Sequence, residues 1–244
     1  MNQFCYYLKV MEIKNNILEP NLETMALHGV HLGALRAHSN PKMKSYVWSN
    51  KNVFQIIDLE KSKEDLEKAL SFLVGVKEKG GTILFVGTGF AAKELTQKIA
   101  EDLNMPYVTE RWLCGTFTNF ETIQKRVEYF KSLETKKAAG EFEKYTKKER
   151  MKLDKEIELL KVKFDGIRNM SKLPDAVLIL DLKKDETSVR EAKRKGIKII
   201  GIVDTNIDPA IADYPVPAND DAISSVKYIL EKVKEVILDS KQEK

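Results

Sequence analysis

The clearest hydrophobic pattern in the chain lies between residues 80 and 119. Residues 82–86, TILFV, form an unbroken β-favouring run, which is typical of a parallel strand buried on both faces. Residues 90–103 then carry an apolar side chain at every fourth position, as one face of a helix requires, and a second short apolar run follows Pro106. A strand, a helix and a strand within about thirty residues predict a right-handed βαβ unit.

The same alternation returns in the last third of the chain. Apolar runs at 176–180 and 197–203 predict two further buried strands, with a basic helix from Asp185 to Lys195 between them that Gly196 closes. A short run at 214–216 contains Pro215, with Pro217 directly after it, and predicts an edge strand. A final amphipathic helix follows, capped by Asn219-Asp220-Asp221. About five parallel strands predict an α/β fold with a flavodoxin-like, doubly wound sheet.

Before the βαβ unit, the pattern predicts smaller elements. Asn21 caps a short helix that extends to Leu27, and the runs at 46–48 and 53–57 predict a hairpin across a polar turn. Ser62 and Asp65 resemble a capping box at the start of a longer amphipathic helix, which Gly80-Gly81 ends.

Between residues 120 and 164 the strand signal disappears. Ile123, Val127 and Phe130 are spaced by four and three positions, and a similar spacing runs from Leu153 to Phe164, with Gly140 and polar residues between the two stretches. This is the spacing of a coiled-coil seam, so the sequence predicts an antiparallel coiled-coil helical hairpin inserted into the α/β domain. The predicted division is an N-terminal extension (1–20), an α/β domain (21–119 and 170–238), the hairpin (120–169) and a frayed tail (239–244).

The charge distribution changes the picture. The 244 residues include 41 Lys and Arg against 37 Asp and Glu, a net charge of +4, and 43% hydrophobic residues are enough for a sizeable core. Residues 121–168 hold 14 of the cations and 10 of the acids, which leaves 27 of each elsewhere. A locally basic surface suits a polyanionic partner such as RNA.

Other features limit the class of protein. The two cysteines, Cys5 and Cys114, are too few for a disulfide framework and predict a reducing, cytoplasmic setting. We identify no membrane-spanning run and no signal peptide pattern, so no membrane partner is expected.

The turn after the first buried strand admits two interpretations. Its sequence G-T-G-F-A-A matches the dinucleotide fingerprint at Gly87, Gly89 and Ala92, and Glu110 follows at a distance suited to a ribose hydroxyl. This favours a nucleotide-binding α/β enzyme. The alternative is that two glycines simply make a strand-to-helix turn and Glu110 is an exposed charge.

Candidate catalytic and metal residues are sparse. His28, His31 and His38 cluster in sequence but have no cysteine or acid beside them, so they predict hydrogen bonding or stacking rather than zinc binding. Three aspartates follow strand ends and suit either Mg²⁺ or the closing of turns, namely Asp181, Asp204 and Asp208. No P-loop or nucleophile elbow accompanies them, and Cys114 has no nearby histidine. We therefore expect no catalytic, cofactor-binding or metal-binding residues.

One stretch interleaves basic and planar side chains. Arg36, Lys42 and Lys44 flank His38, and Tyr46 and Trp48 follow. This combination suits phosphate contact together with stacking on exposed bases, although a solvated loop would have the same composition.

Seven motifs in order resemble one family. They are GVHLGALRAHSNPKM, IIDLEKS, ILFVGT, RWLCGTFTN, LPDAVLILD, GIVDTNIDP and NDDAI. Together they resemble the family of ribosomal protein number two of the bacterial small subunit, over about residues 22–236. The resemblance implies a flavodoxin-like domain with a protruding coiled-coil hairpin, as the pattern itself predicts.

The resemblance also implies a function. Members of this family are structural proteins rather than enzymes; they bind small-subunit ribosomal RNA between head and body, contact neighbouring small-subunit proteins and support docking of ribosomal protein number one. Neither DNA nor a membrane is an expected partner. Carried over by matching motif, the RNA-facing residues are Arg36, Asn40, Lys42 and Lys44 in the first loop and Arg111, Trp112, Thr118 and Asn119 in the RW loop.

This chain departs from the family pattern at three places. Ala34 follows Gly33 where a histidine is usual, and Cys114 replaces a usual glycine. Gly89-Phe90 stands where the family often has a basic pair, which creates the dinucleotide-like turn and removes positive charge from it.

Overall fold

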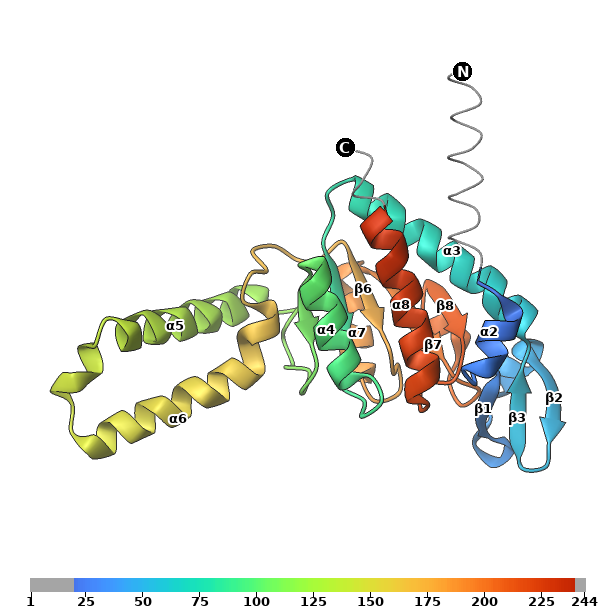
Figure 1. Cartoon of the computed structure of the whole chain (residues 1–244), viewed down its shortest axis with the longest axis horizontal. Helices are drawn as coiled ribbons and strands as arrows, with labels where there is room; N and C mark the ends of the chain where they lie inside the picture. Colours follow the sequence, from blue (N-terminus) through green and yellow to red (C-terminus); the bar gives the residue numbers. More distant parts are fainter. Residues whose placement is uncertain (1–19, 240–244) are drawn as a thin grey trace, which may run out of the picture.

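A five-stranded parallel sheet forms the centre of the computed structural model, which describes residues 20–239 (Figure 1). Its strands are β4 (Ile83–Val86), β5 (Tyr107–Val108), β6 (Ala176–Ile179), β7 (Lys198–Val203) and β8 (Tyr214–Pro217). They lie in the order β5-β4-β6-β7-β8, all parallel, with β8 at an edge. Counted from β4, the order is 2-1-3-4-5, so the predicted flavodoxin-like sheet is confirmed.

Helices cover both faces of this sheet because successive strand residues point to opposite sides. Phe85 and Leu178 contribute to one core, together with α3 (Leu59–Glu78), α4 (Lys93–Leu103) and α8 (Ile223–Asp239). The alternate strand residues form a second core with α7 (Glu186–Lys195) and the loop 111–119. All four residues of β4 and of β6 are buried, as the apolar runs predict.

Two helix starts differ from the sequence-based predictions. α3 begins at Leu59, because the Asp58 side chain accepts a hydrogen bond from the Glu60 amide. The capping box assigned to Ser62 and Asp65 is therefore wrong, and the Ser62 hydroxyl instead donates to the Asp58 carbonyl inside the first turn. α4 begins at Lys93 rather than at residue 90, while α7 ends as predicted at Gly196, with φ of 69°.

A small antiparallel sheet precedes the large one. The predicted hairpin is confirmed as β2 (Val47–Lys51) and β3 (Phe54–Ile57), but a third strand, β1 (Leu32–Leu35), pairs with the other edge of β3. Sequence analysis missed β1 because four residues containing glycine give no clear period. The Asn21 cap is confirmed, since its side chain accepts from the Glu23 amide at the start of α2 (Leu22–Leu27).

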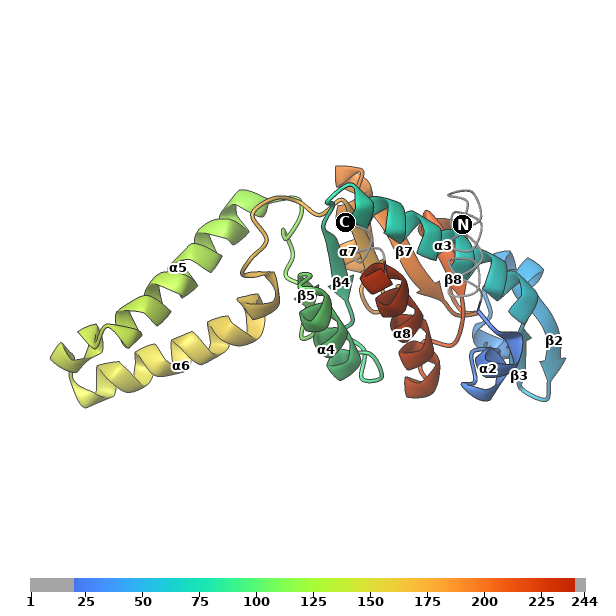
Figure 2. The same cartoon turned by 45° about the horizontal axis from the view of Figure 1, so that its top comes forward.

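Two long helices project from the sheet as the predicted antiparallel hairpin. They are α5 (Phe120–Ala138) and α6 (Lys147–Phe164), inserted between β5 and β6. Figures 1 and 2 show the pair extending to the side opposite the small sheet. The seam residues Val127, Phe130 and Ile157 are buried, and Phe142 closes the tip from the short helix η3 (Glu141–Lys144).

Some sequence-based predictions concern residues outside the described range. Residues 1–19 of the predicted extension and residues 240–244 of the predicted tail are not among the described residues. Within residues 20–239, no helix has the length and apolar character that crossing a membrane requires.

Candidate nucleic-acid interface

The first candidate loop exposes its cations on a rigid support. Arg36 begins the short helix η1 (Arg36–His38), and Lys42 and Lys44 lie in η2 (Pro41–Tyr46) with exposed side chains. Met43 between the two lysines is fully buried and anchors η2 to the core beneath it. This alternation directs Lys42 and Lys44 to solvent while the backbone is held.

Asn40 has a structural part in this loop. Its side-chain oxygen accepts a hydrogen bond from the backbone amide of Lys42 at 3.0 Å. Its backbone amide donates to the Thr205 carbonyl at 2.8 Å. The loop is thereby attached to the carboxyl end of β7. Lys42 forms a 2.5 Å ion pair with Asp208, which follows β7, so part of its charge is neutralised within the protein.

The second candidate loop, residues 111–119, has an exposed rim and a buried interior. Arg111 and Asn119 at its two ends are exposed. Trp112 is only 6% exposed, and its ring packs edge-on against Phe117 with 4.8 Å between centroids. In this arrangement the Trp112 ring is not available for stacking on a base.

Glu191 of α7 organises this loop. Its carboxylate accepts hydrogen bonds from the amides of Gly115 at 2.7 Å, Phe117 at 2.9 Å and Thr118 at 3.1 Å. The Thr118 hydroxyl and the Trp112 indole also donate to it, at 3.2 and 3.3 Å. Thr118, predicted to face RNA, thus directs both of its donors inward.

The environment of Glu191 favours its charged form. Burial of the carboxylate opposes ionisation, but the surrounding N–H donors outweigh that effect and hold the pKa of Glu191 below its usual range. Sequence analysis did not identify this residue. The available signal was an acid next to Ala192, on the inward side of a helix whose exposed charges are mostly basic.

The dinucleotide-like turn is occupied by groups of this chain. Thr88 donates its hydroxyl proton to the Asp185 carboxylate at 3.0 Å, and the Lys184 ammonium donates to the Thr88 carbonyl at 2.8 Å. Burial raises the pKa of Asp185 to about 6. Asp181 also lies beside Gly89. Carboxylates at this position disfavour a pyrophosphate.

Neither glycine of that turn has a positive φ. A side chain at Gly87 would overlap the Thr96 hydroxyl, whereas one at Gly89 would make only ordinary contacts, 3.8 Å from Asp181. Glu110, the proposed ribose ligand, forms a 2.6 Å ion pair with Lys93 instead. These contacts are those of a strand-to-helix turn packed closely against its own helix.

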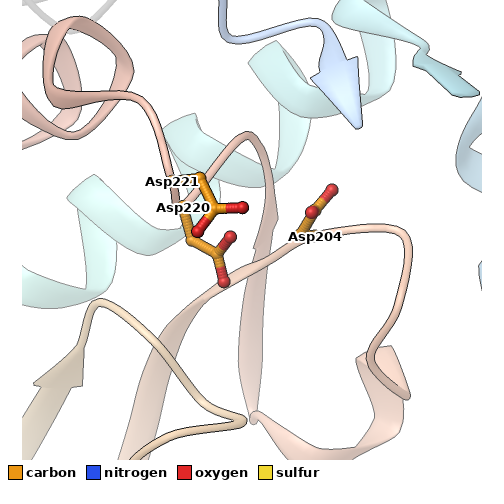
Figure 3. Close-up of side chains that lie close together, drawn as sticks. All are labelled: Asp204, Asp220 and Asp221. Atoms are coloured by element: carbon orange, nitrogen blue, oxygen red, sulfur yellow. The ribbon is translucent and has the colours of Figure 1, made fainter. Parts of the chain in front are cut away.

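Three aspartates converge at the carboxyl end of the sheet (Figure 3). Oxygen atoms of Asp204, Asp220 and Asp221 all lie within 4.8 Å of one another. Burial and mutual repulsion raise the pKa of Asp204 to about 6 and that of Asp220 to about 8. The group therefore carries fewer than three negative charges at neutral pH. Asp208, another aspartate that the sequence singled out, is not part of this group and forms an ion pair with Lys42 instead.

The histidines do not form a metal site with one another. His28 stacks on Tyr228 with 5.3 Å between ring centroids, and His38 is exposed at the edge of a cleft. Among the described residues, the aspartate group is the one cluster of three metal-ligand side chains, and it contains no histidine. Cys114 is a free, exposed thiol in the 111–119 loop.

A cleft of about 620 Å³ is lined both by residues of the small sheet and by members of the aspartate group, which meet where the Ala34 amide of β1 donates to Asp204 at 3.1 Å. The small sheet contributes the apolar residues Leu32, Leu35 and Phe54 to the lining, and these residues are 44%, 39% and 50% exposed. Asp204 and Asp221 also line the cleft. An exposed apolar surface beside acidic groups has the character of a protein-docking site.

Comparison with known proteins identifies the family. The family model for ribosomal protein S2 matches residues 25–240. The chain belongs to the ribosomal protein S2 family. It is 45% identical over 213 residues to the small ribosomal subunit protein uS2 of Dictyoglomus thermophilum, covering 87% of each chain. It is 41% identical over 214 residues to uS2 of Coprothermobacter proteolyticus, covering 88% of this chain and 80% of that protein.

Membership in the S2 family agrees with the fold and bears on the two interpretations of the turn. The resemblance found in the motifs is confirmed over nearly the whole described range. The match includes the small sheet, the hairpin and the sheet together. It offers no support for a nucleotide-binding enzyme.

Proposed function

We propose that this protein is a structural component of the small ribosomal subunit, present in the cytoplasm within ribosomes, and that it acts in translation without catalysis. The observation that carries this proposal is the match to the S2 family over residues 25–240. The relatives are named as small ribosomal subunit proteins, which makes ribosomal RNA and neighbouring ribosomal proteins the natural partners.

At finer detail, we propose that the protein binds small-subunit RNA between head and body through two loops. The exposed cations Arg36, Lys42, Lys44 and Arg111 would contact phosphates, and Asn119 would add a neutral contact. Asn40, Trp112 and Thr118 would hold the loops in shape, as their internal hydrogen bonds support.

We further propose that ribosomal protein number one docks on the cleft between the small sheet and the aspartate group. Support comes from the exposed residues Leu32, Leu35 and Phe54, which lie together in one cleft. Interfaces between proteins have apolar centres and polar rims, and this cleft offers both.

The first test is co-sedimentation of the protein with small subunits that lack it, across a salt series, with free protein as the control. We expect stoichiometric co-migration that persists at moderate salt. Protein that stays at the top of the gradient would contradict the ribosomal role and return attention to nucleotide binding at the 87–92 turn.

Cys114 allows a direct test of where the RNA lies. An iron chelate tethered to Cys114, in a Cys5→Ser background, should cleave ribosomal RNA near the 111–119 loop. The matched control carries the chelate at Ser71→Cys, an exposed position on α3 across the sheet, with Cys114→Ser. Equal cleavage from both positions, or none from Cys114, would remove the loop from the RNA interface.

A further inference from the structure

The outer face of α7 is more basic than its sequence indicates, because two of the three acidic residues in and around the helix are buried while the basic residues are exposed. Residues 183–198 contain seven Lys and Arg and three Asp and Glu. Two of these acids, Asp185 and Glu191, are 3% and 7% exposed and are held by internal hydrogen bonds. Glu186 is the one acid of this segment that is exposed, whereas all seven cations are exposed.

Several of these cations have no acid beside them. Arg190 pairs with Glu186 at 3.3 Å and Lys198 with Asp213 at 2.7 Å. Lys183, Arg194 and Lys195, in contrast, form no ion pair with any residue of the range 20–239. Their charges are available to an external anion.

The position of α7 links the two loops that the motifs identified separately. On one side, Glu191 binds the 111–119 loop through Gly115, Phe117 and Thr118. The residue before Glu191 on the same helix, Arg190, is exposed.

On the other side, α7 reaches the loop that carries Lys42. Lys42 holds the pKa of Asp208 below its usual range through their hydrogen bond, and Lys193 of α7 adds a smaller electrostatic effect on the same carboxylate. Lys193 and Lys198 also line one shallow pocket of about 210 Å³ with Asp213. Lys193 at the end of α7 thus lies near the Asp208 carboxylate that Lys42 of the first loop binds.

We propose that the exposed face of α7, with Arg190, Lys193, Arg194 and Lys195, binds RNA phosphates and joins the two loops into one continuous surface. This inference rests on the proposed ribosomal function and extends it to a helix that no motif indicated. Phosphodiester groups are the fitting partner because the face is rich in cations and has no large exposed apolar residue between 183 and 198.

The test compares two triple variants with the same change in charge. The first is Lys193→Gln, Arg194→Gln and Lys195→Gln on α7. The control is Lys79→Gln, Lys98→Gln and Lys227→Gln, three exposed cations on or next to the helices that cover the opposite face of the sheet. Each protein binds small subunits that lack it, and the binding constant is measured across a salt series.

We expect the α7 variant to bind more weakly and with a shallower dependence on salt. Each lost phosphate contact lowers the slope of log K against log salt by about 0.7 to 0.9, so three contacts lower it by roughly 2 to 3. The control should keep the wild-type slope. Thermal unfolding of both variants should match the wild type, since the substituted side chains are exposed.

Two outcomes would overturn the inference while leaving the proposed function intact. One is wild-type binding by the α7 variant, and the other is an equal loss of slope in both variants, which would reflect net charge alone. Wild-type protein that fails to bind subunits would instead contradict the proposed function itself.

Tethered cleavage separates RNA from an acidic protein as the partner of α7. A chelate at Lys195→Cys, with both natural cysteines replaced by serine, should cut ribosomal RNA, and a chelate at Lys227→Cys should not. Suppose that the protein with the chelate at Lys195→Cys binds the subunit without cleaving its RNA, while the α7 triple variant binds the subunit more weakly. That result would assign this face to a protein partner and reject RNA.

Discussion

At the scale of single residues, one carboxylate determines the shape of the candidate RNA loop. Glu191 receives donors from four residues of the 111–119 loop, and three of these donors are backbone amides. The loop forms neither helix nor strand, so secondary structure does not supply backbone carbonyl acceptors for these three amides. The side chain on α7 therefore replaces secondary structure as the support of the loop.

We predict that Glu191→Gln lowers the free energy of unfolding by about 1 to 3 kcal/mol, because a buried charged acceptor is lost. Hydrogen exchange should accelerate at the amides of Gly115, Phe117 and Thr118. The control is Glu186→Gln on the exposed side of the same helix, which should change neither quantity. Unchanged exchange in Glu191→Gln would show that the loop is held by its other contacts.

The same residue gives a pH dependence with a definite sign. Because the pKa of Glu191 in the folded protein lies below its unfolded value, its stabilising effect is complete above the unfolded pKa, about 4.3. The effect is lost as the pH falls through the folded pKa. The stability difference between wild type and Glu191→Gln should therefore shrink in acid.

At the scale of elements, the hairpin depends on a narrow seam. Val127, Phe130 and Ile157 are buried between α5 and α6, and Phe130 is completely inaccessible. Outside the seam the hairpin helices are strongly charged, with an ion pair of 2.7 Å between Lys137 and Asp154 that is exposed on both sides. Exposed pairs of this kind contribute little, so packing of the seam carries the stability.

We predict that Phe130→Ala destabilises the hairpin by about 3 to 5 kcal/mol, the usual cost of removing a buried phenylalanine side chain. Chemical denaturation followed by circular dichroism measures the change. Tyr129→Ala, next to it and 40% exposed, is the control and should have a much smaller effect. Equal effects of the two variants would mean that the seam is not the stabilising contact.

At the scale of the whole molecule, the proposed partners contact different places. The cleft beside the small sheet is separated by the core of the α/β sheet from the hairpin, which extends to the other side (Figure 2). The cations of α7 lie on one face of the sheet, opposite α3, α4 and α8. A substitution that weakens binding at the cleft should therefore leave binding at α7 intact, and the reverse should also hold.

We predict that Leu35→Ser with Phe54→Ser leaves binding to small subunits unchanged but reduces the amount of ribosomal protein number one that those subunits retain. Both side chains are exposed at the cleft, so the fold should tolerate the change. Leu159→Ser with Val162→Ser, on exposed hairpin positions, is the matched control. Full retention of protein number one by the cleft variant would move its docking site elsewhere.

Much of this architecture follows from local pattern. Buried parallel strands have to be apolar on both sides, so the unbroken apolar runs at 83–86 and 176–179 predict them directly. The spacing of the seam residues predicts the hairpin. β1 was not predicted because a strand of four residues is defined by its pairing with β3 and shows no hydrophobic period of its own. The Asp58 cap of α3 was missed because two capping signals, at Asp58 and at Ser62, lie close together in the sequence.

The chain by itself determined most of the strands, the long helices and the seam, because burial imposes a period that the sequence must follow. Only the tertiary structure decided which charges face solvent. Asp185 and Glu191 count against the basic residues of α7 in the sequence, yet folding buries both and leaves the cations outside. Trp112 shows the reverse, a candidate for base stacking that the fold turns inward. Charge and planarity are properties of residues, whereas their exposure depends on contacts between segments far apart in the chain.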